Sequence, residues 1–294
     1  MRISISVTNY SWPSGPRAFG AELTRIVQAA DQAGVDTVWV PDHLLQVDPT
    51  AAPDQTEMYE AYTLLGYIAA RTERVRLGTM VSAATLRPPA LLVKAVTTLD
   101  VLTGGRAWLG IGAGYHTGEA EALGLPLPPT AERFDRLEET LQIANRMWAG
   151  DETPFEGRYY QLTRPADSPG PVQRPHPPIL VGGTGERRTL RLVAQYADAC
   201  NLFDIPDGGQ TIRHKLDVLA RHCSEVGRPY EAIEKVLGSR LEAGESSESF
   251  ARRCVAAAEL GIDHVTLIVA GPWTSEGLDT LAAAIPALRN VSPS

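Results

Sequence analysis

The chain has 294 residues, of which 44% are apolar, so it is long enough to bury a sizeable core. Its 35 acidic and 27 basic residues give a formal net charge of −8, which argues against a nucleic-acid partner. Cys200, Cys223 and Cys254 are too widely spaced for a disulfide framework or a zinc site, which favours buried thiols in a reduced, cytoplasmic protein. No apolar run approaches the length of a membrane span, so we expect no membrane partner.

Strand and helix patterns alternate from the N-terminus onward. Residues 3–7 predict a buried strand that ends in a polar loop, and an apolar helical stripe then runs to Gly34. Residues 37–40 are the second predicted strand, which ends in Pro41-Asp42-His43. A long polar loop leads to a helix that we expect at about residues 59–70.

The next stretch predicts a strand, a helix and a second strand in direct succession. Val75 to Val81 is a short apolar run typical of a buried strand. Pro88 and Pro89 open a helical apolar pattern that Gly104 and Gly105 end, and residues 106–111 form the second strand. Because such a crossover joins parallel strands, this unit indicates a parallel sheet.

Residues 151–178 interrupt this alternation. They contain seven prolines and a hairpin-like segment at residues 155–160, which we interpret as an ordered insertion over the mouth of a barrel. Strand patterns resume at residues 179–181, 199–203, 235–238 and 264–269, with helical patterns between and after them.

About eight strand–helix units follow from this count, so the predicted fold is α/β, a single TIM-barrel domain of the (β/α)8 type over residues 1–294. An open dinucleotide-binding sheet would require G-x-G-x-x-G directly after the first strand, and that turn is absent here. In a barrel the loops after the strands form the active face, so functional residues are expected there.

Two of these loops contain residues that suggest a specific chemical role. Gly182 to Gly185 lie between a strand and a helix, where backbone N–H groups and the helix dipole can bind a phosphate; the alternative is a turn that only requires positive φ. His43, at the end of the second strand, is a candidate general base or ring contact, or else a structural histidine. His214 and His222 have no acidic partner at metal-ligand spacing, so we expect no metal site.

Short motifs along nearly the whole chain resemble the luciferase-like flavin and deazaflavin oxidoreductases, in particular the branch that uses coenzyme F420. The motifs are Val38-Trp39-Val40-Pro41-Asp42-His43, Arg76-Leu77-Gly78-Thr79-Met80-Val81, Thr98-Leu99-Asp100-Val101-Leu102-Thr103-Gly104-Gly105-Arg106, Leu109-Gly110-Ile111-Gly112-Ala113-Gly114, Glu132-Arg133-Phe134, Pro178-Ile179-Leu180-Val181-Gly182-Gly183 and Tyr196-Ala197-Asp198-Ala199-Cys200-Asn201.

The resemblance implies a cofactor ring held over the carboxyl ends of the strands. In relatives a non-proline cis peptide follows Gly-Thr of the third strand and supports the ring. This bond maps onto Met80-Val81, and Thr79, Met80 and Val81 are the cofactor-binding residues that the resemblance implies there. The cofactor phosphate would lie on the turn formed by Gly182, Gly183, Thr184, Gly185 and Glu186. Asp42 and His43 match a pair that lies beside the ring.

The chain departs from the family pattern at the proton donor. Where one deazaflavin dehydrogenase group carries a glutamate, this sequence has Tyr115 followed by His116, and either could serve as proton donor. Glu119 is interpreted as structural. Many relatives also have Arg-His-Pro in place of Arg87-Pro88-Pro89.

The predicted function is hydride transfer between coenzyme F420 and a small organic substrate. The alternatives are a monooxygenase that uses reduced FMN from a separate reductase, and a flavin-binding barrel without turnover. A homodimer is possible.

Overall fold

A computed structural model, which describes residues 1–48 and 50–292, places nine parallel strand segments in one sheet that curls into a barrel. The order in the sheet is β3-β2-β1-β11-β10-β9-β8-β5-β4. Their bounds are β1 (Arg2–Ser6), β2 (Thr37–Val40), β3 (Arg76–Thr79), β4 (Ser82–Ala83), β5 (Leu109–Gly112), β8 (Ile179–Val181), β9 (Ala199–Phe203), β10 (Glu234–Arg240) and β11 (His264–Ile268).

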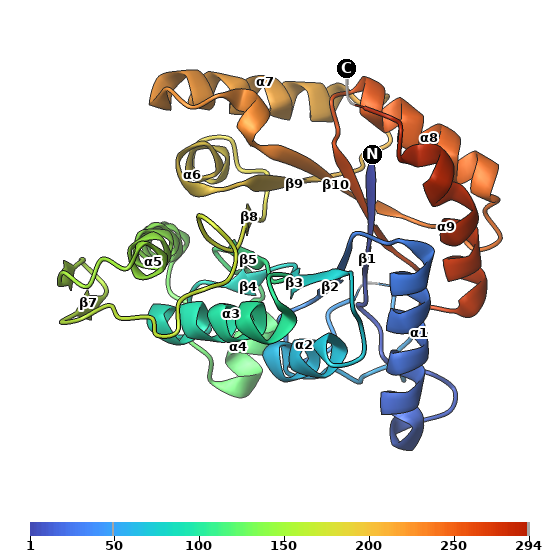
Figure 1. Ribbon diagram of the computed structural model, residues 1–294, viewed down its shortest axis with the longest axis horizontal. Helices are drawn as coiled ribbons and strands as arrows, with labels where there is room; N and C mark the ends of the chain where they lie inside the picture. Colours follow the sequence, from blue (N-terminus) through green and yellow to red (C-terminus); the bar gives the residue numbers. More distant parts are fainter. Residues whose placement is uncertain (49, 293–294) are drawn as a thin grey trace.

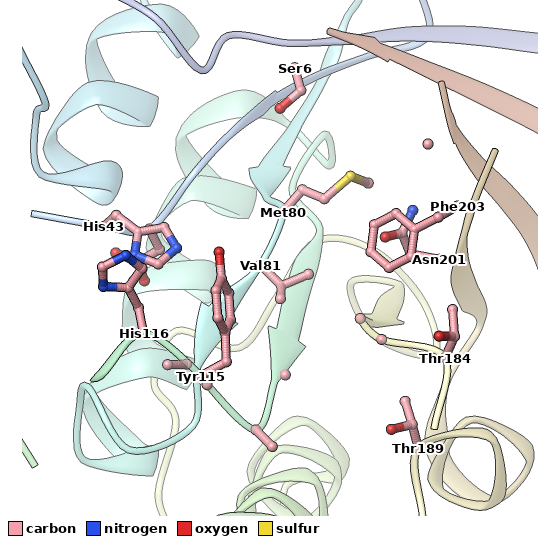
Figure 2. Close-up of a pocket in the computed structure, with 18 of the residues that line it drawn as sticks. Ser6, His43, Met80, Val81, Tyr115, His116, Thr184, Thr189, Asn201 and Phe203 are labelled. Atoms are coloured by element: carbon pink, nitrogen blue, oxygen red, sulfur yellow. The ribbon is translucent and has the colours of Figure 1, made fainter. Parts of the chain in front are cut away.

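The barrel closes through a broken third strand. β3 pairs with β2 and β4 pairs with β5, while Leu77 bridges to Ala107 beside β5. β3 and β4 are therefore two halves of one barrel strand, separated by Met80 and Val81 (Figure 2). The peptide bond between these two residues is cis, as predicted. Counted this way, eight strands close the barrel, which confirms the predicted fold.

Helices surround the strands on the outside (Figure 1). Proline opens α3, and left-handed glycines end α1 and α3, as predicted; left-handed glycines also end α5 and α7. The bounds are α1 (Phe19–Ala33), α2 (Ala61–Ala69), α3 (Pro89–Thr103), α4 (Thr117–Leu123), α5 (Thr130–Ala149), α6 (Thr189–Tyr196), α7 (Gln210–Val226), α8 (Ser247–Glu259) and α9 (Ser275–Leu288). Within the described ranges no helix is long and apolar enough to cross a membrane.

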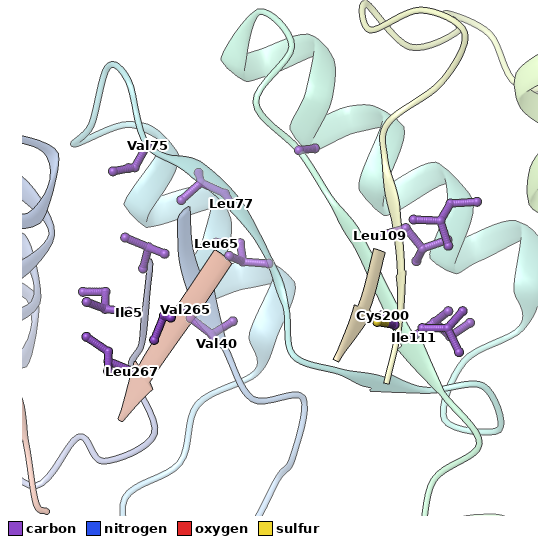
Figure 3. Close-up of a cluster of buried hydrophobic side chains, with 14 of the residues drawn as sticks. Ile5, Val40, Leu65, Val75, Leu77, Leu109, Ile111, Cys200, Val265 and Leu267 are labelled. Atoms are coloured by element: carbon purple, nitrogen blue, oxygen red, sulfur yellow. The ribbon is translucent and has the colours of Figure 1, made fainter. Parts of the chain in front are cut away.

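The main core lies between the sheet and the helices. Alternate strand residues such as Ile5, Leu77, Leu109 and Leu267 point outward and are fully buried against the helices (Figure 3). The alternation follows from the strand period of two, and it leaves the other set of residues inside the barrel. Cys200, Cys223 and Cys254 are buried free thiols, as the spacing predicted.

The barrel interior is filled in layers. Trp39 and Trp108 form its apolar layer together with Leu180, Ala199 and Val236. A Cβ at Gly78 would lie 2.8 Å from atoms of both tryptophans, so only glycine leaves room for them there.

A polar plug closes the amino-terminal end of the barrel. His264, which is fully buried, lies 2.6 Å from the carboxylate of Glu234 and 2.5 Å from the hydroxyl of Ser4. Arg2 pairs with Glu234 at 2.8 Å on the outer side. Because these buried polar groups satisfy one another, the plug seals this end and leaves the carboxyl end as the open face.

The proline-rich insertion is placed differently from the prediction. Its hairpin exists, with β6 (Phe155–Glu156) pairing antiparallel to β7 (Gln161–Leu162). Glu139 on α5 accepts hydrogen bonds from backbone N–H groups of the hairpin, and Asp100 on α3 accepts from the segment that follows it. These two carboxylates hold the insertion against α3 and α5, and none of residues 151–178 lines the main cavity. It therefore covers the side of the barrel and not its mouth.

Candidate active site

A cavity of about 1220 Å³ opens at the carboxyl ends of the strands. Most residues predicted for the site line it together: Asp42, His43, Met80, Val81, Tyr115, His116, Gly182, Gly183, Thr184 and Gly185. They come from four different strand ends, which is the arrangement expected for a barrel active site. The cavity is large enough for a ring cofactor and a small substrate side by side.

His43 is oriented by a carboxylate on α4. Glu119 Oε2 accepts a hydrogen bond from His43 Nδ1 at 2.8 Å, and Oε1 accepts from the backbone N–H groups of Leu44 (2.6 Å) and Leu45 (3.0 Å). Since an ionised carboxylate only accepts, the proton of neutral His43 is on Nδ1 and the lone pair of Nε2 is free. The Nε2 atom can therefore exchange a proton with a ligand.

The surroundings of Glu119 favour its ionised form. Burial, which leaves the residue 7% exposed, acts to raise the pKa of this carboxyl, but the hydrogen bonds from His43 and from the two backbone N–H groups outweigh it and lower the pKa. The sequence predicts a structural role for Glu119 and gives no sign of this contact, because the two residues are 76 positions apart in the chain.

The lowered pKa of Glu119 predicts an acid-sensitive contribution to stability. A carboxyl whose pKa is lower in the folded chain stabilises the fold above its ordinary value of 4.5, and this contribution is lost as the pH falls through the folded-state pKa. We therefore expect Glu119→Gln to narrow the difference in melting temperature between pH 7 and pH 4, as measured by circular dichroism. If the difference in melting temperature is the same in the variant and the wild type, ionised Glu119 does not stabilise the fold.

The two residues predicted as proton donors have different environments. Tyr115 is 68% exposed, and its ring centre lies 5.9 Å from that of His43. Figure 2 draws its ring between His43 and Val81. Partial burial, with a smaller contribution from Glu119, raises the pKa of the Tyr115 hydroxyl. His116 instead caps α4, because its Nδ1 accepts the backbone N–H of Glu119 at 2.9 Å.

Asp42 is engaged by the protein itself. Its carboxylate is fully buried, pairs with Arg87 and accepts a hydrogen bond from Ser82 Oγ at 2.5 Å. Arg87 also reaches Glu60 at 2.6 Å. This network holds the loop that carries His43 in place. Asp42 therefore positions His43, the next residue in the chain, and its carboxylate is not free to contact a ligand.

Val81 forms an apolar floor in the middle of the cavity. A Cβ at Gly182 would lie 2.9 Å from both methyl groups of Val81, and one at Gly112 would lie 3.0 Å from one of them. The two glycines therefore leave space for Val81 to enter the barrel mouth next to Met80. The resulting surface is apolar and flanked by backbone, which suits the face of an aromatic ring.

The glycine turn after β8 offers unpaired donors. The backbone N–H groups of Gly183, Thr184 and Gly185 form no hydrogen bond to the part of the chain that the structure describes. Gly183 has φ +104°, which a side chain would strain. Three successive free N–H groups at the wall of a cavity, ahead of α6, are a binding site for an anion such as a phosphate.

Two predicted residues do not line the cavity. Thr79 is buried in the broken strand, where its hydroxyl donates to the carbonyl oxygen of Gly110 at 2.8 Å. The carboxylate of Glu186 contacts Lys215 (2.5 Å) and His214 (3.1 Å) on α7. Thr79 is an outward-facing strand residue, and Glu186 is held by α7, so neither side chain reaches the ligand space.

The cavity also has a wall that the predicted site residues do not include. It consists of residues near the ends of β1, β9, β10 and β11, most of them inward-facing: Ser6, Asn201, Phe203, Gly238, Ser239, Arg240, Thr266 and Ile268. The signal that could have found most of them is the alternation along each strand, since residues two apart face the same side.

Comparisons with known proteins identify the family of the chain. A family model described as luciferase-like monooxygenase matches residues 1–285. Two relatives, both named F420-dependent glucose-6-phosphate dehydrogenase, come from Microbacterium testaceum and Nakamurella multipartita. The first is 32% identical over 232 residues, which cover 78% of this chain and 66% of the relative. The second is 36% identical over 199 residues, which cover 64% and 54%. The chain thus spans about half to two thirds of the length of these relatives.

A solved structure has the same fold over its whole length. It is an F420-dependent secondary alcohol dehydrogenase in complex with an F420-acetone adduct, and it superposes with a TM-score of 0.83 at 18% identity. The match covers 98% of this chain and 99% of that one.

Proposed function

The chain belongs to the luciferase-like monooxygenase family, and we propose that it is an oxidoreductase that transfers a hydride between coenzyme F420 and a small organic substrate. The observation that carries the proposal is the combination, in one cavity, of an oriented histidine, an apolar floor and a turn with three free N–H groups. The names of the two relatives and of the solved structure support the choice of cofactor.

The residues of the cavity fit such a cofactor. Met80 and Val81 would lie against the ring, and Gly183, Thr184 and Gly185 would hold the phosphate through their N–H groups. A bound deazaflavin supplies a carbon centre that accepts or donates two electrons as a hydride. The protein has to supply binding, orientation and a route for the proton.

His43 is the residue we assign to the proton. When a substrate hydroxyl is oxidised, its proton passes to the free Nε2 of His43, while Glu119 holds Nδ1–H and stabilises the imidazolium that forms. In the reverse direction the same atom returns the proton to the substrate. Tyr115, which is exposed beside His43, would contact the substrate, and His116 would keep α4 and Glu119 in position.

The second candidate function is a monooxygenase that uses reduced FMN from a separate reductase. The observation in its favour is the description of the family model. The anion turn and the apolar floor would accept either cofactor, whereas a histidine held with a free Nε2 favours proton transfer coupled to hydride transfer. A barrel that binds the cofactor without turnover would have no need of the buried pair between Glu119 and His43.

The test is a parallel titration of the purified protein with coenzyme F420 and with FMN, followed by tryptophan fluorescence. We expect F420 to bind more tightly. F420-loaded protein is then mixed with secondary alcohols and with glucose 6-phosphate, and reduction of the cofactor is recorded by its absorbance. Tighter binding of FMN, together with oxygen consumption by the reduced complex, would refute the proposal in favour of the monooxygenase.

The glycine turn gives a separate prediction. Replacing Gly183 with aspartate should weaken cofactor binding about 10- to 100-fold, because the side chain strains a residue at φ +104° and adds a negative charge beside the phosphate. The measurement is the dissociation constant by fluorescence titration.

The matched control is Gly150→Asp. Gly150 also has positive φ (71°), but it ends α5 and does not line the cavity. Both variants place an aspartate at positive φ and add the same charge, so the control corrects for the added charge at a position outside the cavity. If the two variants bind the cofactor with equal affinity, the phosphate does not bind at this turn.

A further inference from the structure

Arg240 is a cation at the end of β10 that lines the cavity and has no acidic partner in the part of the chain that the structure describes. Among the described residues its guanidinium forms no hydrogen bond and no ion pair, although its carbonyl oxygen accepts a hydrogen bond from Arg253 at 2.8 Å. The backbone of Arg240 is thus fixed while its charged end is free. A guanidinium presents five donors, so a free one at a cavity wall is a ready site for an anion.

The carboxylates near Arg240 are already engaged. Glu245 pairs with Arg253 at 2.7 Å, and Asp204 accepts from Ser239 Oγ at 2.7 Å and lies 4.0 Å from Arg253. Glu242 also lines the cavity, but it is exposed and makes no ion pair with Arg240. Among the described residues, no carboxylate is therefore within ion-pair distance of Arg240.

Thr266 adds an unused donor on the adjacent strand. It is 3% exposed and lines the same cavity, and its hydroxyl has no hydrogen-bond partner among the described residues. The strand register pairs Thr266 with Gly238, so Arg240 projects from the same face two residues further along β10. Because Gly238 has no side chain, this register partner offers the hydroxyl no side-chain hydrogen-bond acceptor. A buried hydroxyl without a partner is costly unless a ligand completes it.

We propose that Arg240 and Thr266 form a subsite for the carboxylate of the substrate, which makes the substrate a small organic acid. This inference rests on the proposed function, because it assumes that the cofactor occupies the same cavity as the substrate. One guanidinium and one hydroxyl match the single charge and two oxygens of a carboxylate. The phosphate of the cofactor has its own donors on the turn after β8, and β9 lies between that turn and β10.

Phe203 separates the two anion sites. It ends β9, is 53% exposed and pairs in register with Gly238. β9 lies between β10, which carries Arg240, and β8, which leads into the glycine turn, and Figure 2 shows the ring of Phe203 at the wall of the cavity. A substrate bound at Arg240 would place its apolar part against Phe203 and its reacting carbon toward the centre of the cavity.

The experiment compares carboxylates with their neutral amides. F420-loaded protein is titrated by calorimetry with straight-chain carboxylates of three to eight carbons and with benzoate, each against the amide of the same skeleton. We expect at least one carboxylate to bind tenfold or more tightly than its amide in the wild type. Arg240→Gln should abolish this difference, and Arg240→Lys should retain part of it.

The matched control is Arg252→Gln, which removes the same charge from an exposed residue on α8 outside the cavity and should leave the difference unchanged. A wild type without preference for any carboxylate, or a preference that survives in Arg240→Gln, would overturn the proposal. If glucose 6-phosphate instead binds more tightly than every carboxylate and loses this binding in Arg240→Gln, that result would overturn the proposal that the substrate is an organic acid. Weaker binding of F420 itself to Arg240→Gln would assign the subsite to the cofactor. Because these titrations need no turnover, and can be repeated with FMN, their failure is distinct from failure of the proposed function.

Discussion

Replacing Gly110 with alanine should leave almost no folded protein. The added Cβ would lie 1.7 Å from the carbonyl oxygen of Thr79 and 2.9 Å from its carbonyl carbon. Both atoms are backbone of the neighbouring barrel strand, and Thr79 is also tied to Gly110 by a hydrogen bond of 2.8 Å. Neither strand can move away without opening the barrel at its broken third strand. We expect a loss of about 4 kcal/mol or more in the free energy of unfolding.

Gly66→Ala is the matched control for this prediction. Gly66 lies inside α2, and a Cβ there would meet no atom within 4 Å. The same chemical change should therefore stabilise the protein by about 0.5–1 kcal/mol, because alanine loses less backbone entropy in a helix. Soluble yield and urea unfolding followed by circular dichroism measure both variants. A Gly110→Ala protein that unfolds like the wild type would mean that the strands around Thr79 and Gly110 are not packed as described.

The architecture was predictable because its signals are local. The apolar run at Val75 to Val81, the prolines that open α3 and the glycines that end it each follow from backbone chemistry within a few residues. The insertion is expected over the mouth because strand patterns resume directly after it, whereas its observed hydrogen bonds are to α3 and α5. Its position depends on Asp100 and Glu139, whose backbone partners lie 19 to 73 residues away in sequence. No pattern in the sequence identifies such a pairing.

The site was predictable at the level of loops and less so at the level of side chains. Knowing that loops after parallel strands meet at one face was enough to bring His43, Tyr115 and the glycine turn into one cavity. The same rule cannot say that the carboxylate of Asp42 would be taken by Arg87, or that Glu186 would be held by Lys215. The partner of a long charged side chain depends on which elements pack beside it in the folded protein. Local sequence patterns do not identify that partner.

The second large effect concerns the orientation of His43. Glu119→Gln should lower kcat by roughly 10²- to 10⁴-fold while cofactor affinity stays close to that of the wild type. The carboxylate accepts three hydrogen bonds, two of them on Oε1 from Leu44 and Leu45. A glutamine keeps these two only by turning its carbonyl oxygen toward them, which places its NH₂ group on Nδ1 of His43. The ring proton then moves to Nε2, and the atom that faces the ligand becomes a donor where a base is required.

His43→Ala should lower kcat by a similar factor, again with little effect on cofactor affinity, because the proton transfer matters mainly in the transition state. Glu121→Gln is the control for Glu119→Gln, since Glu121 is an exposed glutamate on the same helix.

Tyr115→Phe should change KM more than kcat, because the tyrosine is expected to contact the substrate. The rates come from cofactor absorbance with the substrate that the panel identifies.

A readout without turnover separates the tautomer from a general loss of structure. In protein labelled with ¹⁵N-histidine, the shifts of the two His43 ring nitrogens report which one carries the proton, and Glu119→Gln should exchange them. A variant that exchanges the two shifts and keeps wild-type kcat would mean that His43 does not handle the substrate proton. A variant that loses kcat without exchanging them would mean that Glu119 acts through the position of the Leu44–Leu45 loop. Only the joint change assigns Glu119 as the residue that sets the protonation of His43.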